Sequence, residues 1–224
     1  HCGKVNLLTA SRGGFTNVAA GGEPSVALAE QFCLARNFAI DSGDQMVAAM
    51  PGTTSEMVAA QCASFGPAMT AQLTAASNKP RAEVLQDVAA FALSTGMTQD
   101  QMRTTATLCL SAGYSTDNMD VALGSALLLV AMGSAPHAEL VGHHLHDGFG
   151  AAKRPDLARE WYQSAIDALQ GGAVPVFAPN QSDRTDVLIW ATTGATEKAS
   201  VATPEMSVPV VAALPTFQLP PTGN

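Results

Sequence analysis

The sequence is poor in charged and aromatic side chains. Charged residues make up 13% of the 224 residues, and aromatic residues make up 5%. A soluble domain usually carries a charged share of about 25%. Hydrophobic residues still account for 47%, which excludes a wholly disordered chain. With so few aromatic residues, the core must be built from Ala, Leu, Val and Met, and small side chains favour closely packed helices over sheets. The composition therefore predicts an all-α fold.

Long basic clusters and long apolar runs are also missing. The formal net charge is −8, from 19 acids and 11 bases, and no basic cluster is longer than Lys153-Arg154. Nucleic-acid binders need basic patches to neutralise phosphates, so we expect no nucleic-acid partner. The longest apolar stretch, 121–132, is interrupted by Gly124 and Ser125. A membrane span needs roughly 20 apolar residues, so we expect none within this chain.

The four cysteines occur without a CxxC motif, which argues against zinc ribbons and thioredoxin-type redox sites. Their even number and wide spacing suit one or two disulfides, although buried free thiols would fit the number equally well. The sequence opens without an initiator Met, which favours a processed protein and a periplasmic or otherwise extracytoplasmic location. Cys33 and Cys62 lie near the middles of two successive predicted helices, so we predict that they pair. Cys2 and Cys109 are then the remaining pair.

Helical periodicity divides the chain into three parts. Residues 1–23 are rich in glycine and predict an irregular lead-in, whereas residues 24–194 predict a helical domain. Residues 195–224 carry five of the 13 prolines and predict an extended tail. Within the domain, apolar spacing and turn residues predict helices over 24–50 with a break at 41–44, about 55–77 with a kink at Gly66-Pro67, 81–94, 98–113, 115–132, 138–147, 155–170 and 183–191.

An internal repeat links two of these turns. Residues 94–102 align with residues 111–119 at an offset of 17 residues. Each copy resembles a helix closed by glycine, followed by a new helix capped by Thr98 or Ser115. The offset is half the period of a helical-hairpin repeat of about 34 to 36 residues. We therefore expect an irregular, solenoid-like array of helical hairpins, with chance similarity of the two turns as the alternative.

One segment carries the pattern of a known repeat family. Leu140 to Ile166 resembles the Sel-type repeat, a helical-hairpin relative of the tetratricopeptide repeat. Leu145, Ala151 and Arg154 depart from the family pattern, which usually has Tyr, Val and Asp there. The matching positions are Val141-Gly142, Gly148, Gly150, Ala158, Trp161-Tyr162 and Ala165-Ile166.

The matching residues have packing roles. Gly148 and Gly150 allow a tight turn between two helices, and Ala158 and Ala165 allow the helices to approach closely. Trp161 supplies a large apolar anchor between neighbouring hairpins. The resemblance implies a structural and protein-binding module, and it offers no catalytic residue to carry over.

Histidines concentrate in one short segment. His137, His143, His144 and His146 lie within ten residues, followed by Asp147. His143 and His146 share a helical face at the i, i+3 spacing, which could ligate zinc or copper. No HExxH motif is present, and in the repeat pattern His143 and His144 occupy variable positions that face solvent or a binding groove. We therefore expect a groove surface, with a metal site as the alternative.

These features predict a non-catalytic scaffold or adaptor for protein partners in the bacterial cell envelope, with no cofactor. The first alternative is a metal-binding or enzymatic helical domain that uses His143 and His146. The second is an accessory subunit of a membrane-bound complex. The residues predicted to bind partners are His143, His144, Tyr162 and, in the tail, Leu214, Phe217 and Leu219.

Overall fold

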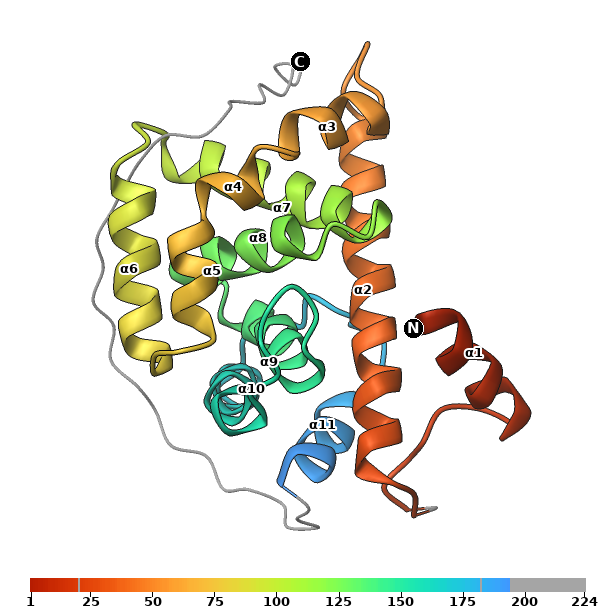
Figure 1. Cartoon of the computed structure of the whole chain (residues 1–224). Helices are drawn as coiled ribbons and strands as arrows, with labels where there is room; N and C mark the ends of the chain where they lie inside the picture. The colour runs from red at the N-terminus through yellow and green to blue at the C-terminus, as the bar shows by residue number, and fades with distance from the viewer. Residues whose placement is uncertain (20, 182, 194–224) are drawn as a thin grey trace.

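The computed structural model describes residues 1–19, 21–181 and 183–193, and these residues form helices without any strand (Figure 1). The all-α prediction is confirmed. The predicted tail, with Leu214, Phe217 and Leu219, lies outside the described residues. The elements are α1 (Cys2–Ser11), α2 (Pro24–Ala48), α3 (Ser55–Cys62), α4 (Phe65–Ala68), α5 (Thr70–Ala76), α6 (Arg81–Leu93), α7 (Gln99–Ser115), α8 (Met119–Ala131), the short 3-10 helix η1 (Ala135–His137), α9 (Ala138–Asp147), α10 (Pro155–Gln170) and α11 (Arg184–Thr193).

The long helix α2 organises the molecule. Helix α2 extends along most of the length of the molecule in Figure 1 and contacts α1, α7, α9 and α11. The pairs α7 with α8 and α9 with α10 pack directly against each other. In a solenoid each repeat contacts only its neighbours in the chain, whereas α2 contacts helices far away in the sequence. The predicted solenoid-like order is therefore not confirmed.

Helix α8 forms the centre of the core. It contacts α4, α5, α6, α7 and α9, and all its residues from 121 to 130 are buried. This agrees with its sequence, which is apolar nearly all round. No helix among the described residues is long and apolar enough to cross a membrane.

The lead-in predicted to be irregular contains a helix. Residues 2–11 form α1, which packs along the outside of α2. Val5 and Thr9 are buried, and the Thr9 hydroxyl donates a hydrogen bond of 2.7 Å to Glu30 Oε1. Most of the segment's glycines follow the helix, so the glycine-rich composition of residues 1–23 concealed a helical stretch at their start.

The disulfide pairing differs from the prediction. Cys2 pairs with Cys33 and Cys62 pairs with Cys109, so the predicted Cys33–Cys62 bond and the remaining Cys2–Cys109 pair are both wrong. The prediction treated α2 and α3 as neighbours because they follow each other in sequence. In the structure, α1 covers Cys33 on α2, and α3 packs against α7, which carries Cys109. Two disulfides are compatible with an extracytoplasmic location.

The predicted break at 41–44 is absent, because α2 continues through it to Ala48. Gly43 is buried, and a Cβ atom placed on it would lie 2.1 Å from Ser111 Cβ on α7. The Ser111 hydroxyl donates a hydrogen bond of 3.1 Å to the Ile40 carbonyl oxygen. Gly43 therefore permits the close crossing of α2 and α7 and does not interrupt a helix.

Replacing Gly43 by alanine is expected to lower the free energy of unfolding by about 1–3 kcal/mol, because the added methyl group overpacks this crossing. Alanine would otherwise stabilise a helix relative to glycine by about 0.5–1 kcal/mol. Urea unfolding of Gly43→Ala measures the effect. The exposed neighbour Ser42→Ala is the matched control. Equal or higher stability of Gly43→Ala would contradict the close crossing.

Both copies of the repeat include a turn between two helices, but only in the first copy does the glycine, Gly96, lie in that turn. Thr98 caps α7 through a reciprocal capping box with Gln101. In the second copy Gly113 lies inside α7, and the cap of α8 is Asn118, not Ser115. A Cβ atom on Gly113 would lie 2.5 Å from the Ala122 backbone nitrogen. The second glycine thus serves close packing of α7 on α8.

The helix predicted over 55–77 is divided into three short helices. Thr54 caps α3 as expected, with its hydroxyl oxygen accepting a hydrogen bond from the Met57 backbone N–H. Gly66-Pro67 lies in α4, which separates α3 from α5. The predicted kink at this dipeptide is therefore seen as a division of the helix.

Candidate functional site

The glycines of the repeat-like segment lie where the helices α9 and α10 meet their neighbours. Gly142 faces the ring of Tyr162, and a Cβ atom there would lie 2.8 Å from Tyr162 Cδ1. Gly148 ends α9 with a positive φ of 81°. Gly150 has a φ of 63°, and a Cβ atom on it would lie 2.8 Å from the Met119 carbonyl carbon. These are packing and turn roles, as expected for these positions.

Ala158, Trp161 and Ala165 of α10 are also buried. Trp161 is 0% exposed, so the largest side chain of the segment lies wholly inside the protein. The structural roles predicted for these three residues agree with this burial.

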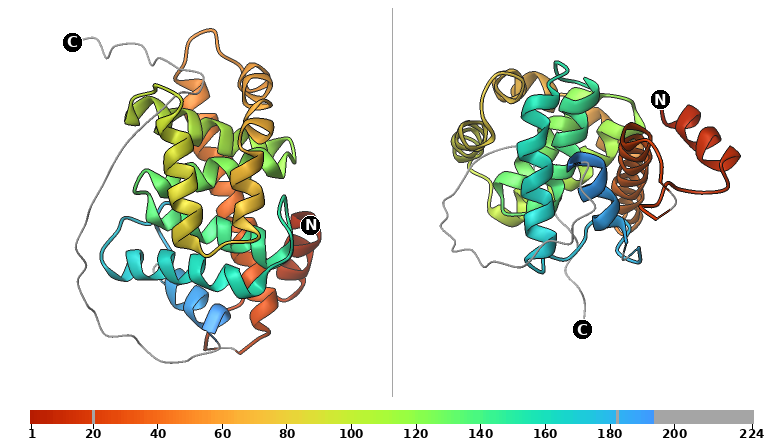
Figure 2. Two further views of the ribbon diagram at one scale, coloured as in Figure 1. Left: turned by 60° about the vertical axis from the view of Figure 1, so that its left-hand side comes forward. Right: turned by 90° about the horizontal axis from the view of Figure 1, so that it is seen from below.

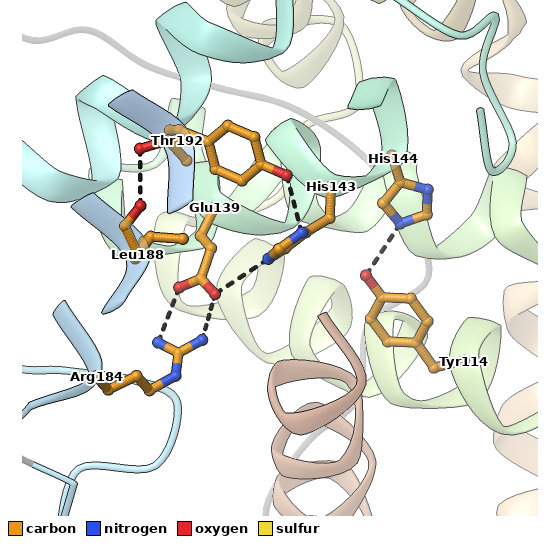
Figure 3. Close-up of polar contacts among 8 residues, drawn as sticks. Tyr114, Glu139, His143, His144, Arg184, Leu188 and Thr192 are labelled. Carbon is orange, nitrogen blue, oxygen red and sulfur yellow. Dashed lines mark hydrogen bonds and ion pairs between the residues drawn. The ribbon is translucent and has the colours of Figure 1, made fainter. Parts of the chain in front are cut away.

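The three residues predicted to bind partners from the helical domain are buried. His143 and His144 are 0% exposed and Tyr162 is 2% exposed, so the prediction that the histidines face solvent or a groove is wrong. Helix α9 is enclosed because it contacts α2, α8 and α10. Figure 3 shows that adjacent histidines on α9 reach different partners.

A chain of polar contacts joins three helices through His143 (Figure 3). The guanidinium of Arg184, on α11, donates to both carboxylate oxygens of Glu139, with 2.9 Å between Nη1 and Oε2. His143 Nε2 lies 3.3 Å from Glu139 Oε1, and the Tyr162 hydroxyl lies 2.9 Å from His143 Nδ1. A neutral imidazole protonated on Nε2 satisfies both contacts, donating to Glu139 and accepting from Tyr162.

His144 forms a second polar contact set next to the first. Its Nδ1 lies 2.5 Å from the Phe149 carbonyl oxygen, and its Nε2 lies 3.0 Å from the Tyr114 hydroxyl on α7. A neutral ring that donates from Nδ1 and accepts at Nε2 satisfies both partners. Phe32 of α2 lies beside both histidines, with ring centroids 5.4 Å from His143 and 6.0 Å from His144.

Burial and pairing decide the charges of this cluster. Burial lowers the pKa of His144 to about 4, and burial also lowers the pKa of His143 despite its hydrogen bond to Glu139. Burial alone would raise the pKa of Glu139, but the Arg184 guanidinium and the hydrogen bond with His143 lower it to about 2. Burial raises the pKa of Tyr162. At neutral pH the cluster therefore holds one ion pair among neutral rings.

The stability of the protein is expected to fall as the pH falls from about 6.5 towards 4. The pKa of His144 is about 4 in the folded protein and about 6.5 in an unfolded chain. The contribution of His144 to the free energy of unfolding is complete above the pKa of the unfolded state. As the pH falls, the unfolded state binds a proton first, so this free energy decreases by about 2–3 kcal/mol between pH 7.5 and pH 4.5. Urea unfolding at the two pH values measures this loss. His144→Gln should reduce the difference, and equal stability at both pH values would contradict the prediction.

The predicted metal alternative lacks converging ligands. His146 contacts Asp147 at 3.0 Å, whereas both ring nitrogens of His143 contact Glu139 and Tyr162. Within the residues that the structure describes, no group of three or more His, Cys, Asp or Glu side chains could hold a metal ion. His143 and His146 both lie against the Tyr162 ring, with ring centroids 5.0 Å and 6.5 Å from it, but their nitrogens contact different partners.

The sequence did not identify three residues of the cluster, Glu139, Tyr114 and Arg184. Glu139 precedes His143 by four residues, which is a usable helical signal. Tyr114 and Arg184 lie in segments that no local pattern connects to α9. Arg184 in particular is 45 residues from its partner Glu139.

No family model, curated protein or solved structure matches this chain.

Proposed function

We propose that the protein is a non-catalytic interaction module of the bacterial cell envelope, which binds a segment of a partner protein in the groove between α5 and α6. The observation that carries the proposal is this groove, of about 500 Å³. Its lining combines small, apolar and polar side chains: Ala71, Gln72, Thr74, Ala75, Asn78, Lys79, Asp87, Ala90 and Phe91.

The chemistry of the groove suits a polypeptide segment. Ala71 and Ala90 are exposed and small, so an incoming chain can approach the helix backbones closely. Phe91 is half-buried and offers an apolar contact. Gln72 Oε1 is buried and accepts no hydrogen bond from any described residue. The exposed polar side chains of the groove can bond the backbone of an extended or helical segment, while its apolar walls contact the side chains of that segment.

The buried cluster supports a binding role better than a catalytic one. His143, His144, Glu139 and Tyr162 are at most 2% exposed, and they bond to one another or to nearby protein groups. A catalytic acid or base must come within hydrogen-bond reach of its substrate, and burial denies these groups that access. Two disulfides support placing the module in an oxidising compartment such as the periplasm.

Site-specific photo-crosslinking tests the proposal in intact cells. A photoreactive residue at Ala71 should give one adduct of defined mass, and Ala90→Arg, which fills the groove from its exposed side, should abolish it. Two matched controls lie on exposed positions: the same photoreactive residue at Ala60 of α3, and Gln86→Arg on α6. Identical adducts from Ala71 and Ala60, or no effect of Ala90→Arg, would overturn the groove assignment.

Elemental analysis separates this proposal from the metal-binding alternative. Protein purified without a His tag is expected to contain no stoichiometric zinc or copper. One metal ion per chain, lost on His143→Gln or His146→Gln, would instead support the metal-binding domain.

A further inference from the structure

Helix α1 presents one face that no other part of the described protein covers. It lies at the edge of the molecule beside α2 (Figures 1 and 2). Val5 and Thr9 are its buried residues. The helical period places Leu7 opposite this buried stripe, with Lys4 and Leu8 beside each other between Leu7 and the stripe, and Leu7 is 74% exposed and Leu8 41%.

Exposed apolar side chains concentrate at this end of the chain. Seven large hydrophobic side chains are exposed among the described residues. Three of them, Leu7, Leu8 and Phe15, lie within nine residues of one another, and Phe15 is 48% exposed. Single exposed apolar residues are ordinary, whereas several gathered on one short segment mark an interaction surface.

The same segment is the basic part of an acidic protein. Residues 1–22 contain Lys4 and Arg12 but no Asp or Glu, so their side chains carry +2 with histidine neutral. The remaining residues hold all 19 acids and the other 9 of the 11 bases, which gives −10. Lys4 and Arg12 are exposed, and neither forms an ion pair with another described residue.

Helix α1 is also held in place on the protein. The Cys2–Cys33 disulfide joins it to α2. Glu30 accepts hydrogen bonds from the Thr9 hydroxyl and from the Thr16 backbone N–H, both at 2.7 Å. The helix therefore exists before any partner arrives, so that binding does not require it to fold.

We infer that the outward face of α1, together with Phe15, binds the surface of an anionic lipid bilayer. The leucines and Phe15 enter the interfacial region, while Lys4 beside the leucines and the exposed Arg12 at the C-terminal end of α1 contact lipid phosphates. The position of this face on a protruding helix suits a flat surface. The strongly acidic remainder is repelled from the same surface, which orients the protein with α1 towards the lipid. The contact is weak and reversible, because it uses one short helix and two cations.

Vesicle co-sedimentation with the full chain tests this inference. The probes are vesicles of phosphatidylcholine alone and of phosphatidylcholine mixed with phosphatidylglycerol. We expect binding to the anionic vesicles at low salt, little binding to the neutral vesicles, and a loss of binding at 0.5 M NaCl as the charges are screened. The double variant Leu7→Glu/Leu8→Glu should weaken binding by about tenfold or more.

A double variant with the same change of charge provides the matched control. Met57 and Leu93 are exposed by 49% and 47%, and they lie on α3 and α6. Met57→Glu/Leu93→Glu should bind as the unchanged protein does, apart from the small effect of two added charges. Circular dichroism checks that both variants fold.

Three outcomes would overturn the inference. The first is no binding to the anionic vesicles, and the second is equal weakening by the two double variants. The third is an oligomer that Leu7→Glu/Leu8→Glu converts to a monomer in the absence of vesicle binding, which would assign the face to a second copy of the chain. The crosslinking result at the α5–α6 groove is independent of all three.

Discussion

Replacing Glu139 by alanine is expected to lower the free energy of unfolding by about 3–5 kcal/mol, because removing one partner of a buried ion pair leaves the other charge uncompensated. The Arg184 side chain is 6% exposed and donates twice to this carboxylate. His143 also loses its contact at Nε2. Urea unfolding of Glu139→Ala at pH 7.5, followed by circular dichroism, measures the loss.

An exposed ion pair supplies the control. Arg154 and Asp156 are paired near the start of α10, with 35% and 63% of their side chains exposed. Asp156→Ala is therefore expected to lower the stability far less than Glu139→Ala does. If Glu139→Ala does not fold, Glu139→Gln keeps the size and shape of the side chain but removes its charge and replaces one acceptor oxygen by an NH2 donor, and it should still cost more than Asp156→Ala. A cost for Glu139→Gln no larger than the control would contradict a buried ion pair at this position.

Removing the Cys62–Cys109 disulfide is expected to cost about 4 kcal/mol, the chain-entropy value for a loop of this length. The bond joins residues 47 positions apart and links α3 to α7 in the core. Cys62→Ala/Cys109→Ala should therefore lower the urea midpoint strongly. Alanine is used in place of serine because serine would add a buried hydroxyl group at each position.

The other disulfide should matter less to the fold as a whole. Cys2–Cys33 spans 31 residues, but α1 packs mainly on α2 at the edge of the protein. Cys2→Ala/Cys33→Ala should release α1 and leave the main unfolding transition nearly in place. Peptide mapping without reduction checks the pairing itself. A Cys33-to-Cys62 peptide, or a larger stability loss from the edge bond than from the core bond, would contradict this assignment.

The features that could be predicted from the sequence are local. The helices α6, α9 and α10 begin and end close to the predicted residues, because proline, glycine and the spacing of apolar residues fix them within a few positions. The burial of α8 followed in the same way from a sequence that is apolar all round.

The features that could not be predicted depend on contacts between distant residues. Gly43 resembles a helix breaker until Ser111, 68 residues later, is seen against it. His143 and His144 resemble surface residues because the sequence does not show that α2, α8 and α10 enclose them. The partner of Glu139 is Arg184, in a helix whose own sequence pattern gives no sign of that pairing.

The N-terminal segment shows a different limit of sequence reasoning. Its composition suggested irregular structure, yet Val5 and Thr9 find buried positions on α2 and the Cys2–Cys33 bond fixes the helix there. Composition averaged over 23 residues obscured a ten-residue helix within them. The disulfide that fixes it was itself assigned to other partners, so both errors have the same origin in the unpredicted contact between α1 and α2.

Our central proposal is that the histidines of α9 are enclosed structural groups that do not bind a metal ion. Nitrogen-15 NMR of the histidine rings tests it most directly, with His143→Gln and His144→Gln to assign the signals. We predict that both rings stay neutral from pH 8 to pH 6, each with one protonated nitrogen, and that equimolar Zn²⁺ leaves their shifts unchanged. Protonation of either ring near pH 6.5, or a shift of its nitrogens on addition of Zn²⁺, would contradict the account.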